Sequence, residues 1–142
     1  MADKKLPFFV YGTLRPGNRL WLQYIGDTQE TSVKGILKGY ALSFAKSSKT
    51  YPTITPRPGD VVYGDILYIK PEHYEGIKRN INWLEVTASG YKKEIVDIET
   101  PNGIVTALTY VAHERYSLFD EEDIIESGDW NKTRESKIGR AK

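Results

Sequence analysis

Two short stretches of the sequence carry residues of the kind that proton transfer and anion binding require. The first begins at the last residue of the apolar run at residues 6–11 and reads Tyr11-Gly12-Thr13-Leu14, then Arg15-Pro16-Gly17. Gly12 lets the backbone approach a bound group closely, so successive N–H groups of this turn can point toward a carboxylate, a phosphate or a developing oxyanion. A strand followed by a glycine turn is also typical of an ordinary loop, and the pattern leaves both interpretations open.

The second stretch contains Glu85, at or just beyond the end of the best helical segment of the chain. Glu85 follows Leu84 by one position and therefore lies near the edge of the apolar face of that helix. Such a position suits an ordinary boundary carboxylate. It also suits a carboxylate that Trp83 and Leu84 shield from water, whose pKa would be raised as a proton-transferring acid or base requires.

The composition excludes several other kinds of site. The sequence contains no cysteine and only two histidines, His73 and His113. It therefore excludes thiol nucleophiles, cysteine-bound zinc, iron–sulfur clusters and a three-histidine metal centre. No serine occurs in a nucleophile-elbow pattern, no lysine in a phosphate loop, and no carboxylates with metal-loop spacing. We therefore expect no metal site of these kinds.

Length and charge predict one ordinary globular domain. The chain has 142 residues, of which 39% are hydrophobic and 27% are charged. We expect a single domain at residues 1–130 and a basic, flexible tail at residues 131–142. The formal net charge is +1, but the tail is strongly cationic, so residues 1–130 are net negative. We therefore do not expect nucleic acid as a partner.

No apolar run approaches the roughly 20 residues that cross a bilayer, and the first residues lack the apolar core of a signal peptide. We expect a cytoplasmic protein without a membrane partner, as a monomer or a weak homodimer.

The elements that must position the two stretches are mostly strands. Apolar runs, alternation and turn residues predict strands at residues 6–11, 33–44, 60–69, 91–98 and 104–112. Gly35 and Gly39 indicate a bent or bulged strand in the second of these, Gly64 indicates a bend or a close backbone approach in the third, and Asn102-Gly103 indicates a hairpin turn. A short acidic helix or turn at 120–126 and a packed end at 127–130 complete the expected elements.

A main helix is expected from Pro71, which favours the first helical position, to Leu84. Its buried face is predicted from apolar residues at the three-and-four spacing, namely Tyr74, Ile77, Ile81 and Leu84. A shorter helix is expected at residues 18–25. With about six strands and one main helix, we expect an α+β fold, a small mixed β-barrel, strongly curved or closed, with short helices.

The order and spacing of these segments resemble the γ-glutamylcyclotransferase-like family, including its small bacterial and plant members such as the cyclotransferase of butirosin biosynthesis. Residues 11–14 match the family's Tyr-Gly-Thr-Leu turn, and residues 81–86 match the segment Leu-Asp-x-x-Glu-Gly that carries its catalytic Glu. Residues 91–93 match its Tyr-x-Arg, and the resemblance covers roughly residues 7–130. The sequence departs from the family pattern at Asn82 for Asp, Val86 for Gly and Lys93 for Arg.

The resemblance implies an enzyme that needs no cofactor and turns a small-molecule γ-glutamyl amine or amide into 5-oxoproline and a free amine. In that family the Glu matched by Glu85 transfers the protons, and backbone donors of the turn from Tyr11 to Leu14 hold the glutamyl end. Tyr91 and Tyr110 would add a hydroxyl group or pack beside it. The amine itself is left open between an amino acid, a lysine ε-amine, glutathione and an antibiotic precursor.

Two other interpretations stay open. The departures at Asn82 and Val86 are consistent with a non-catalytic module that binds a small molecule or a peptide on the same scaffold. A small barrel that binds nucleic acid through the basic tail is the third interpretation, which the negative charge of residues 1–130 disfavours.

Overall fold

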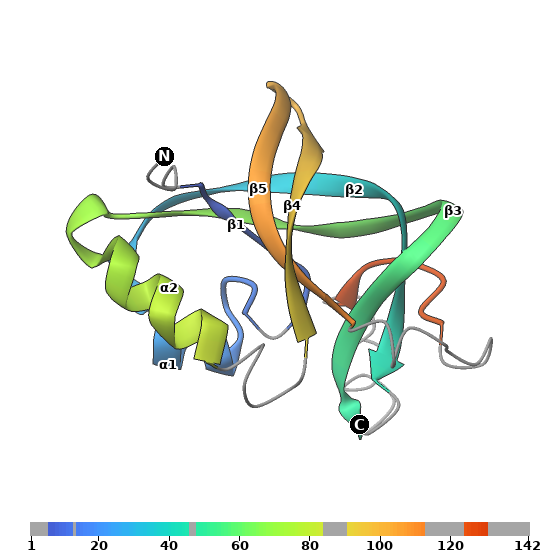
Figure 1. Cartoon of the computed structure of the whole chain (residues 1–142), viewed down its shortest axis with the longest axis horizontal. Coiled ribbons are helices and arrows are strands. Elements are labelled where there is room, and N and C mark those ends of the chain that lie inside the picture. The colour runs from blue at the N-terminus through green and yellow to red at the C-terminus, as the bar shows by residue number, and fades with distance from the viewer. Residues whose placement is uncertain (1–5, 13, 46–47, 84–90, 113–123, 131–142) are drawn as a thin grey trace.

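Strands dominate the part of the chain that the structure, a computed structural model, describes: residues 6–12, 14–45, 48–83, 91–112 and 124–130. They are β1 (Phe8–Val10), β2 (Gln29–Ala45), β3 (Ser48–Ile69), β4 (Tyr91–Thr100) and β5 (Gly103–Ala112). In the order β1-β3-β2-β4-β5 they form a closed barrel (Figure 1), which confirms the expected fold class. Five strands occur in the described residues, where the sequence led us to expect about six.

β3 begins at Ser48, well before the expected residue 60. This part of β3 contains prolines at 52, 56 and 58, although proline cannot donate to a ladder. Pro52 and Pro56 lie in register with Phe44 and Tyr40 of β2, and within the described residues this part of β3 pairs with β2 alone. A strand bonded on one side has N–H positions that need no strand partner, so it can accommodate the prolines.

The expected irregularities in β2 and β3 are confirmed. The register between these strands shifts between Lys38 and Tyr40, where Gly39 has a φ of +86°. At Gly64 a Cβ atom would lie 2.4 Å from the carbonyl oxygen of Val10, so the backbones of β3 and β1 are close enough to require glycine. The predicted hairpin turn is present as well, with Gly103 at a φ of +118°.

The barrel has apolar residues on both faces of β1, β3 and β5. An interior cluster draws on all five strands and includes Phe9, Leu37, Ile66, Ile98 and Ala107. An outer cluster lies on the opposite face and includes Phe8, Leu67 and Leu108 together with residues of α2. Burial on both faces explains why the sequence shows continuous apolar runs in these strands rather than strict alternation.

The outer cluster is covered by α1 (Arg19–Tyr24) and α2 (Tyr74–Asn82), which lie together against one side of the barrel (Figure 1). Two short 3₁₀ helices, η1 (Gly26–Thr28) and η2 (Pro71–His73), lead out of α1 and into α2. The predicted buried face of the main helix is confirmed for Tyr74, Ile77 and Ile81, which are buried. Leu84 lies outside the described residues. Each such side chain contributes roughly 1.5–3 kcal/mol by its burial.

Residues 124–130 return to the barrel and help to fill it. The N–H of Ile125 donates to the carbonyl of Leu42 at 2.8 Å, and the N–H of Tyr63 donates to that of Gly128 at 2.8 Å. Ile125 and Trp130 belong to the interior cluster. The packed end expected at residues 127–130 is therefore confirmed, whereas residues 113–123 and the tail at 131–142 lie outside the described residues.

Candidate active site

The turn after β1 is built from two consecutive hydrogen-bonded turns. The N–H of Arg15 donates to the carbonyl of Gly12 at 3.0 Å, and the N–H of Asn18 donates to the carbonyl of Arg15 at 3.1 Å. Gly17, with a φ of +92°, reverses the chain between them. Gly12 is buried, and Thr13 lies outside the described residues. The backbone thus turns sharply at the position where the sequence predicts an anion-binding turn.

Tyr11 ties this turn to β5. Its side chain belongs to the interior cluster, and its hydroxyl donates to the carbonyl of Tyr110 at 2.6 Å. Leu14 lies on the other side of the sheet, in the outer cluster together with Tyr110 and Ile81 of α2. The structure therefore brings four predicted residues together, Tyr11, Gly12, Leu14 and Tyr110.

Tyr110 in turn fixes the end of α2. Its hydroxyl hydrogen-bonds to Oδ1 of Asn82, the last residue of that helix. The helix end that leads toward Glu85 is thus held against β5, beside the turn. Glu85 itself lies outside the described residues.

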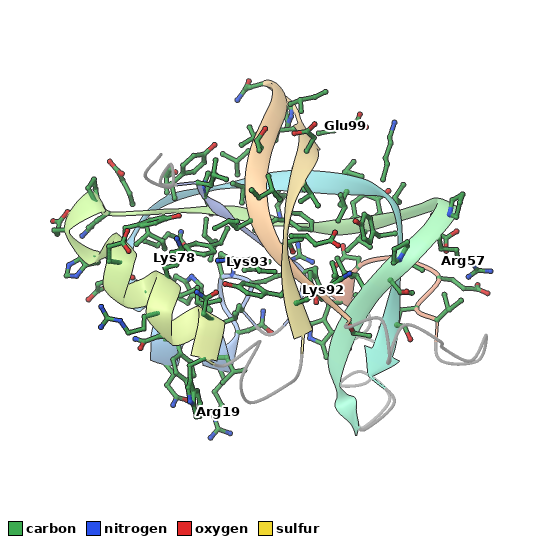
Figure 2. All side chains as sticks on the ribbon, in the orientation of Figure 1. Arg19, Arg57, Lys78, Lys92, Lys93 and Glu99 are labelled. Atoms are coloured by element: carbon green, nitrogen blue, oxygen red, sulfur yellow. The ribbon has the colours of Figure 1, made fainter. Side chains whose placement is uncertain are left out.

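Two further positions lie on β4. Tyr91 is its first residue, and its side chain lies outside the described part of the structure. Lys93, in register with Tyr110, is exposed and projects on the side of β4 that faces α2 (Figure 2). A cation therefore lies beside Tyr110, at the position where the family pattern has Arg.

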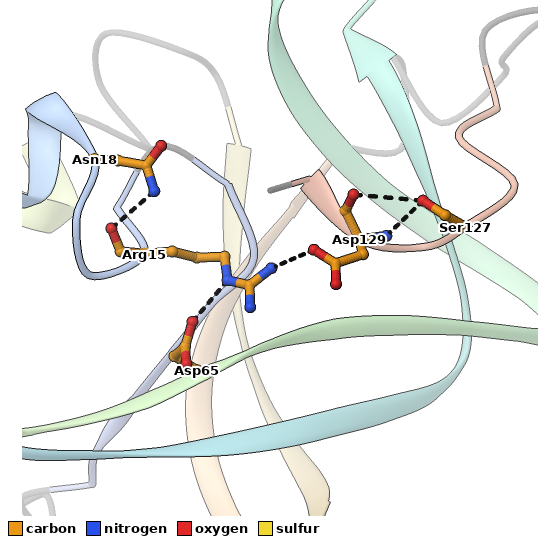
Figure 3. Close-up of polar contacts among 5 residues, drawn as sticks. All are labelled: Arg15, Asn18, Asp65, Ser127 and Asp129. Atoms are coloured by element: carbon orange, nitrogen blue, oxygen red, sulfur yellow. Dashed lines mark hydrogen bonds and ion pairs between the residues drawn. The ribbon is translucent and has the colours of Figure 1, made fainter. Parts of the chain in front are cut away.

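A buried ion network beneath the turn was not predicted. Nε of Arg15 donates to Oδ2 of Asp65 at 2.6 Å, and Nη1 of Arg15 donates to Oδ1 of Asp129 at 2.8 Å (Figure 3). Arg15 is only 3% exposed and Asp65 only 6%. The sequence did hold one indication, because Asp65 interrupts an apolar strand, and a charge buried there needs a partner.

Within residues 6–12, 14–45, 48–83, 91–112 and 124–130, no three His, Asp or Glu side chains gather in a way that could hold a metal ion. No helix among the same residues is long and apolar enough to span a membrane. The groups that this region brings together are tyrosine hydroxyls, a backbone turn and a helix end.

A family model described as gamma-glutamyl cyclotransferase, AIG2-like, matches residues 8–132 of the chain. No curated protein matches the chain significantly in sequence.

Solved structures share the fold at low sequence identity. YkqA from Bacillus subtilis superposes with a TM-score of 0.68 at 23% identity over 96% of this chain, which spans only 43% of YkqA. An uncharacterised protein from Pyrococcus horikoshii gives a TM-score of 0.63 at 22% identity, with 94% and 97% of the two chains covered. A γ-glutamyl cyclotransferase specific to glutathione from yeast gives 0.64 at 14% identity, with 94% and 86% covered. At these identities the likeness establishes the fold alone.

Proposed function

We propose, because this chain belongs to the gamma-glutamyl cyclotransferase, AIG2-like family, that it converts a small γ-glutamyl amine or amide into 5-oxoproline and a free amine. In this reaction the α-amino nitrogen of the glutamyl group forms a bond to the γ-carbonyl carbon. The bond from that carbon to the departing nitrogen then breaks. Ring closure is intramolecular, and well-oriented reactions of this kind reach effective molarities of about 10⁵–10⁸ M.

Glu85 is the residue to which we assign the proton transfers. The attacking amine must lose a proton, and the departing nitrogen must gain one. A single carboxylate between the two nitrogens can accept the first proton and deliver the second, so no other acid or base is needed.

The observation that carries this proposal is the contact between the Tyr110 hydroxyl and Oδ1 of Asn82. It holds the end of α2 beside the turn of Tyr11 and Gly12, which Tyr11 itself ties to the backbone of Tyr110. Glu85 follows Asn82 by three positions, so their Cα atoms are at most about 11 Å apart. Two stretches some seventy positions apart in sequence are thus anchored to the same residue of β5.

Asn82 supports activity in spite of its departure from the family pattern. The contact with Tyr110 uses the side-chain oxygen of Asn82 as an acceptor, and an amide oxygen accepts a hydrogen bond as an Asp oxygen does. The exchange of Asp for Asn therefore keeps this acceptor, while it removes a negative charge and replaces the second carboxylate oxygen with an NH2 donor.

The turn supplies the remaining part of the mechanism. We propose that backbone N–H groups of the segment from Tyr11 to Leu14 hold the glutamyl end and stabilise the oxyanion that forms at the γ-carbonyl. Donors fixed in advance for such a charge typically contribute about 10²–10³ in kcat each.

The decisive experiment is Glu85→Gln, assayed by mass spectrometry for 5-oxoproline with γ-glutamyl amino acids, γ-glutamyl-ε-lysine and glutathione. Gln keeps the shape of the side chain but cannot transfer a proton, so we expect turnover to fall by about 10²–10⁴. Glu75→Gln, at an exposed position of α2, is the matched control and should leave turnover unchanged. Both variants should melt near the temperature of the unmodified protein.

Wild-type turnover by Glu85→Gln would contradict the assignment. If the unmodified protein forms no 5-oxoproline from any substrate but is stabilised against heat by one of them, the chain is a binding module instead.

A further inference from the structure

Arg15 is held at both its backbone and its side chain. Its N–H donates to Gly12, and its carbonyl accepts from the N–H and from Nδ2 of Asn18 at 3.1 and 3.0 Å. Its guanidinium lies between the carboxylates of Asp65 and Asp129 at 2.6 and 2.8 Å (Figure 3). Few degrees of freedom therefore remain for the residue that ends the Gly12 turn.

The same contacts argue against a direct role of Arg15 in ligand binding. A cation beside an anion-binding turn would normally be expected to pair with the carboxylate of the ligand. Arg15, however, is 3% exposed, and two carboxylates already occupy its side chain. A ligand carboxylate that displaced Asp65 would leave that charge buried without its partner.

The two carboxylates come from different parts of the molecule. Asp65 lies on β3, next to the residue that approaches β1, and Asp129 lies in the C-terminal segment. The N–H of Asp129 donates to Oγ of Ser127 at 3.2 Å, which orients the segment locally. The guanidinium thus joins the turn, the barrel wall and the C-terminal segment into one unit.

We propose that Arg15 is a positioning residue: it fixes the Gly12 turn so that its backbone donors face the substrate, and it does not bind the substrate itself. This inference rests on the proposed function. A planar guanidinium can bridge two carboxylates in a fixed geometry, whereas the single ammonium of lysine cannot reproduce that fork.

Asp129→Asn distinguishes a positioning role of Arg15 from a ligand-binding role, because each role predicts a change in a different kinetic constant. If Arg15 positions the turn, weakening its clamp should lower kcat about tenfold and change KM less than twofold, because small displacements of a catalytic group reduce the rate of the chemical step. If Arg15 binds the ligand, removing a competing carboxylate should instead lower KM. Arg15→Lys should share the loss of kcat in the first case and retain activity in the second.

A second measurement does not depend on turnover. We expect hydrogen exchange in peptides covering residues 11–18 to become at least several-fold faster in Asp129→Asn, since the turn loses part of its anchor. The matched control is Asp60→Asn, which weakens the contact of Arg57 with Asp60 (3.4 Å), where both side chains are about one-third exposed. Arg57 lies across the barrel from α2 (Figure 2), so this variant should change neither exchange nor kinetics.

Unchanged exchange at residues 11–18 in Asp129→Asn would overturn the inference, as would a lower KM or an active Arg15→Lys. Faster hydrogen exchange with unchanged kcat would show that Arg15 orders the turn but that this order does not matter for the reaction. If the unmodified chain has no turnover, the proposed function fails, and so does the role of Arg15 in orienting backbone donors toward a substrate. Hydrogen exchange at residues 11–18 would then still show whether Arg15 orders the turn.

Discussion

The barrel is closed by two seams that differ in burial. At the seam of β1 with β5, the hydroxyl of Thr109 donates to the carbonyl of Phe9 at 3.0 Å, and Thr109 is 0% exposed. At the seam of β2 with β4, Lys38 pairs with Glu99 at 3.0 Å while 65% and 48% of these side chains are exposed. Water competes with the second contact but not with the first, so equal distances do not mean equal stabilisation.

The seams also differ in what they support. The buried seam carries Tyr11 and Tyr110, and with them the candidate site. The exposed seam leads to the far end of the hairpin, where Glu99 lies away from α2 (Figure 2). The buried contacts are thus concentrated on the side of the barrel where we propose that a substrate binds.

The largest effect is expected where β1 is pressed against the barrel. In Gly64→Ala the new Cβ would lie 2.4 Å from the carbonyl oxygen of Val10 and 2.7 Å from the ring of Phe9. We expect the free energy of unfolding, measured in urea, to fall by roughly 1–3 kcal/mol. The same change at Gly76 of α2 meets nothing within 4 Å and should instead stabilise by about 0.5–1 kcal/mol. Equal effects at the two glycines would contradict this packing of β1.

A smaller effect tests the buried seam through one hydroxyl. Thr109→Val removes one hydrogen bond to the carbonyl of Phe9 in a dry environment, and should destabilise by about 0.5–1.5 kcal/mol. Thr106 on the same strand donates to Oδ1 of Asp97 at 2.9 Å but is exposed. Thr106→Val should therefore change stability by less than about 0.5 kcal/mol. If both variants lose the same stability in thermal or urea unfolding, the contrast between buried and exposed contacts is wrong.

The smallest effect belongs to the other seam and depends on pH. Burial, and to a lesser extent the hydrogen bond to Glu94 and its negative charge, together raise the pKa of the Tyr40 hydroxyl to about 12. A raised pKa means that the stabilisation from protonated Tyr40 is complete below the ordinary value near 10 and decreases as the pH rises from there through 12.

We therefore expect the free energy of unfolding of the unmodified protein to fall more steeply than that of Tyr40→Phe between pH 10 and pH 12. The other tyrosines ionise in both proteins, so the difference between the two curves isolates Tyr40. Parallel curves across this interval would show that Tyr40 is no more protected than an unfolded tyrosine.

The sequence predicted best what local patterns encode. The apolar run before Gly12 implied a strand buried on both faces, and the spacing of Tyr74, Ile77 and Ile81 implied one buried helix face; both are confirmed. A strongly curved or closed barrel could be expected because most segments indicate strands separated by turn residues, with one main helix. The start of β3 at Ser48 was not predicted, since whether its prolines fit a strand depends on whether a second strand lies beside them.

The polar contacts of the site could not be predicted in the same way. Arg15 meets partners 50 and 114 positions away, and Tyr110 meets Asn82 across 28 positions. No periodicity marks such pairs, because they depend on how the whole barrel closes. The catalytic role of Glu85, the binding roles of Tyr11, Gly12, Thr13, Leu14, Tyr91 and Tyr110, the tail at 131–142, the cytoplasmic location and the monomeric or weakly dimeric state stay predictions.

The return of residues 124–130 to the barrel has a consequence for synthesis. A ribosome releases Arg15 early, yet one of its two carboxylate partners follows 114 positions later, together with the Trp130 side chain that helps to fill the interior. A nascent chain therefore cannot complete its core until almost all of this domain has been translated. Until then, the unfinished chain should expose apolar strands to chaperones and to other chains.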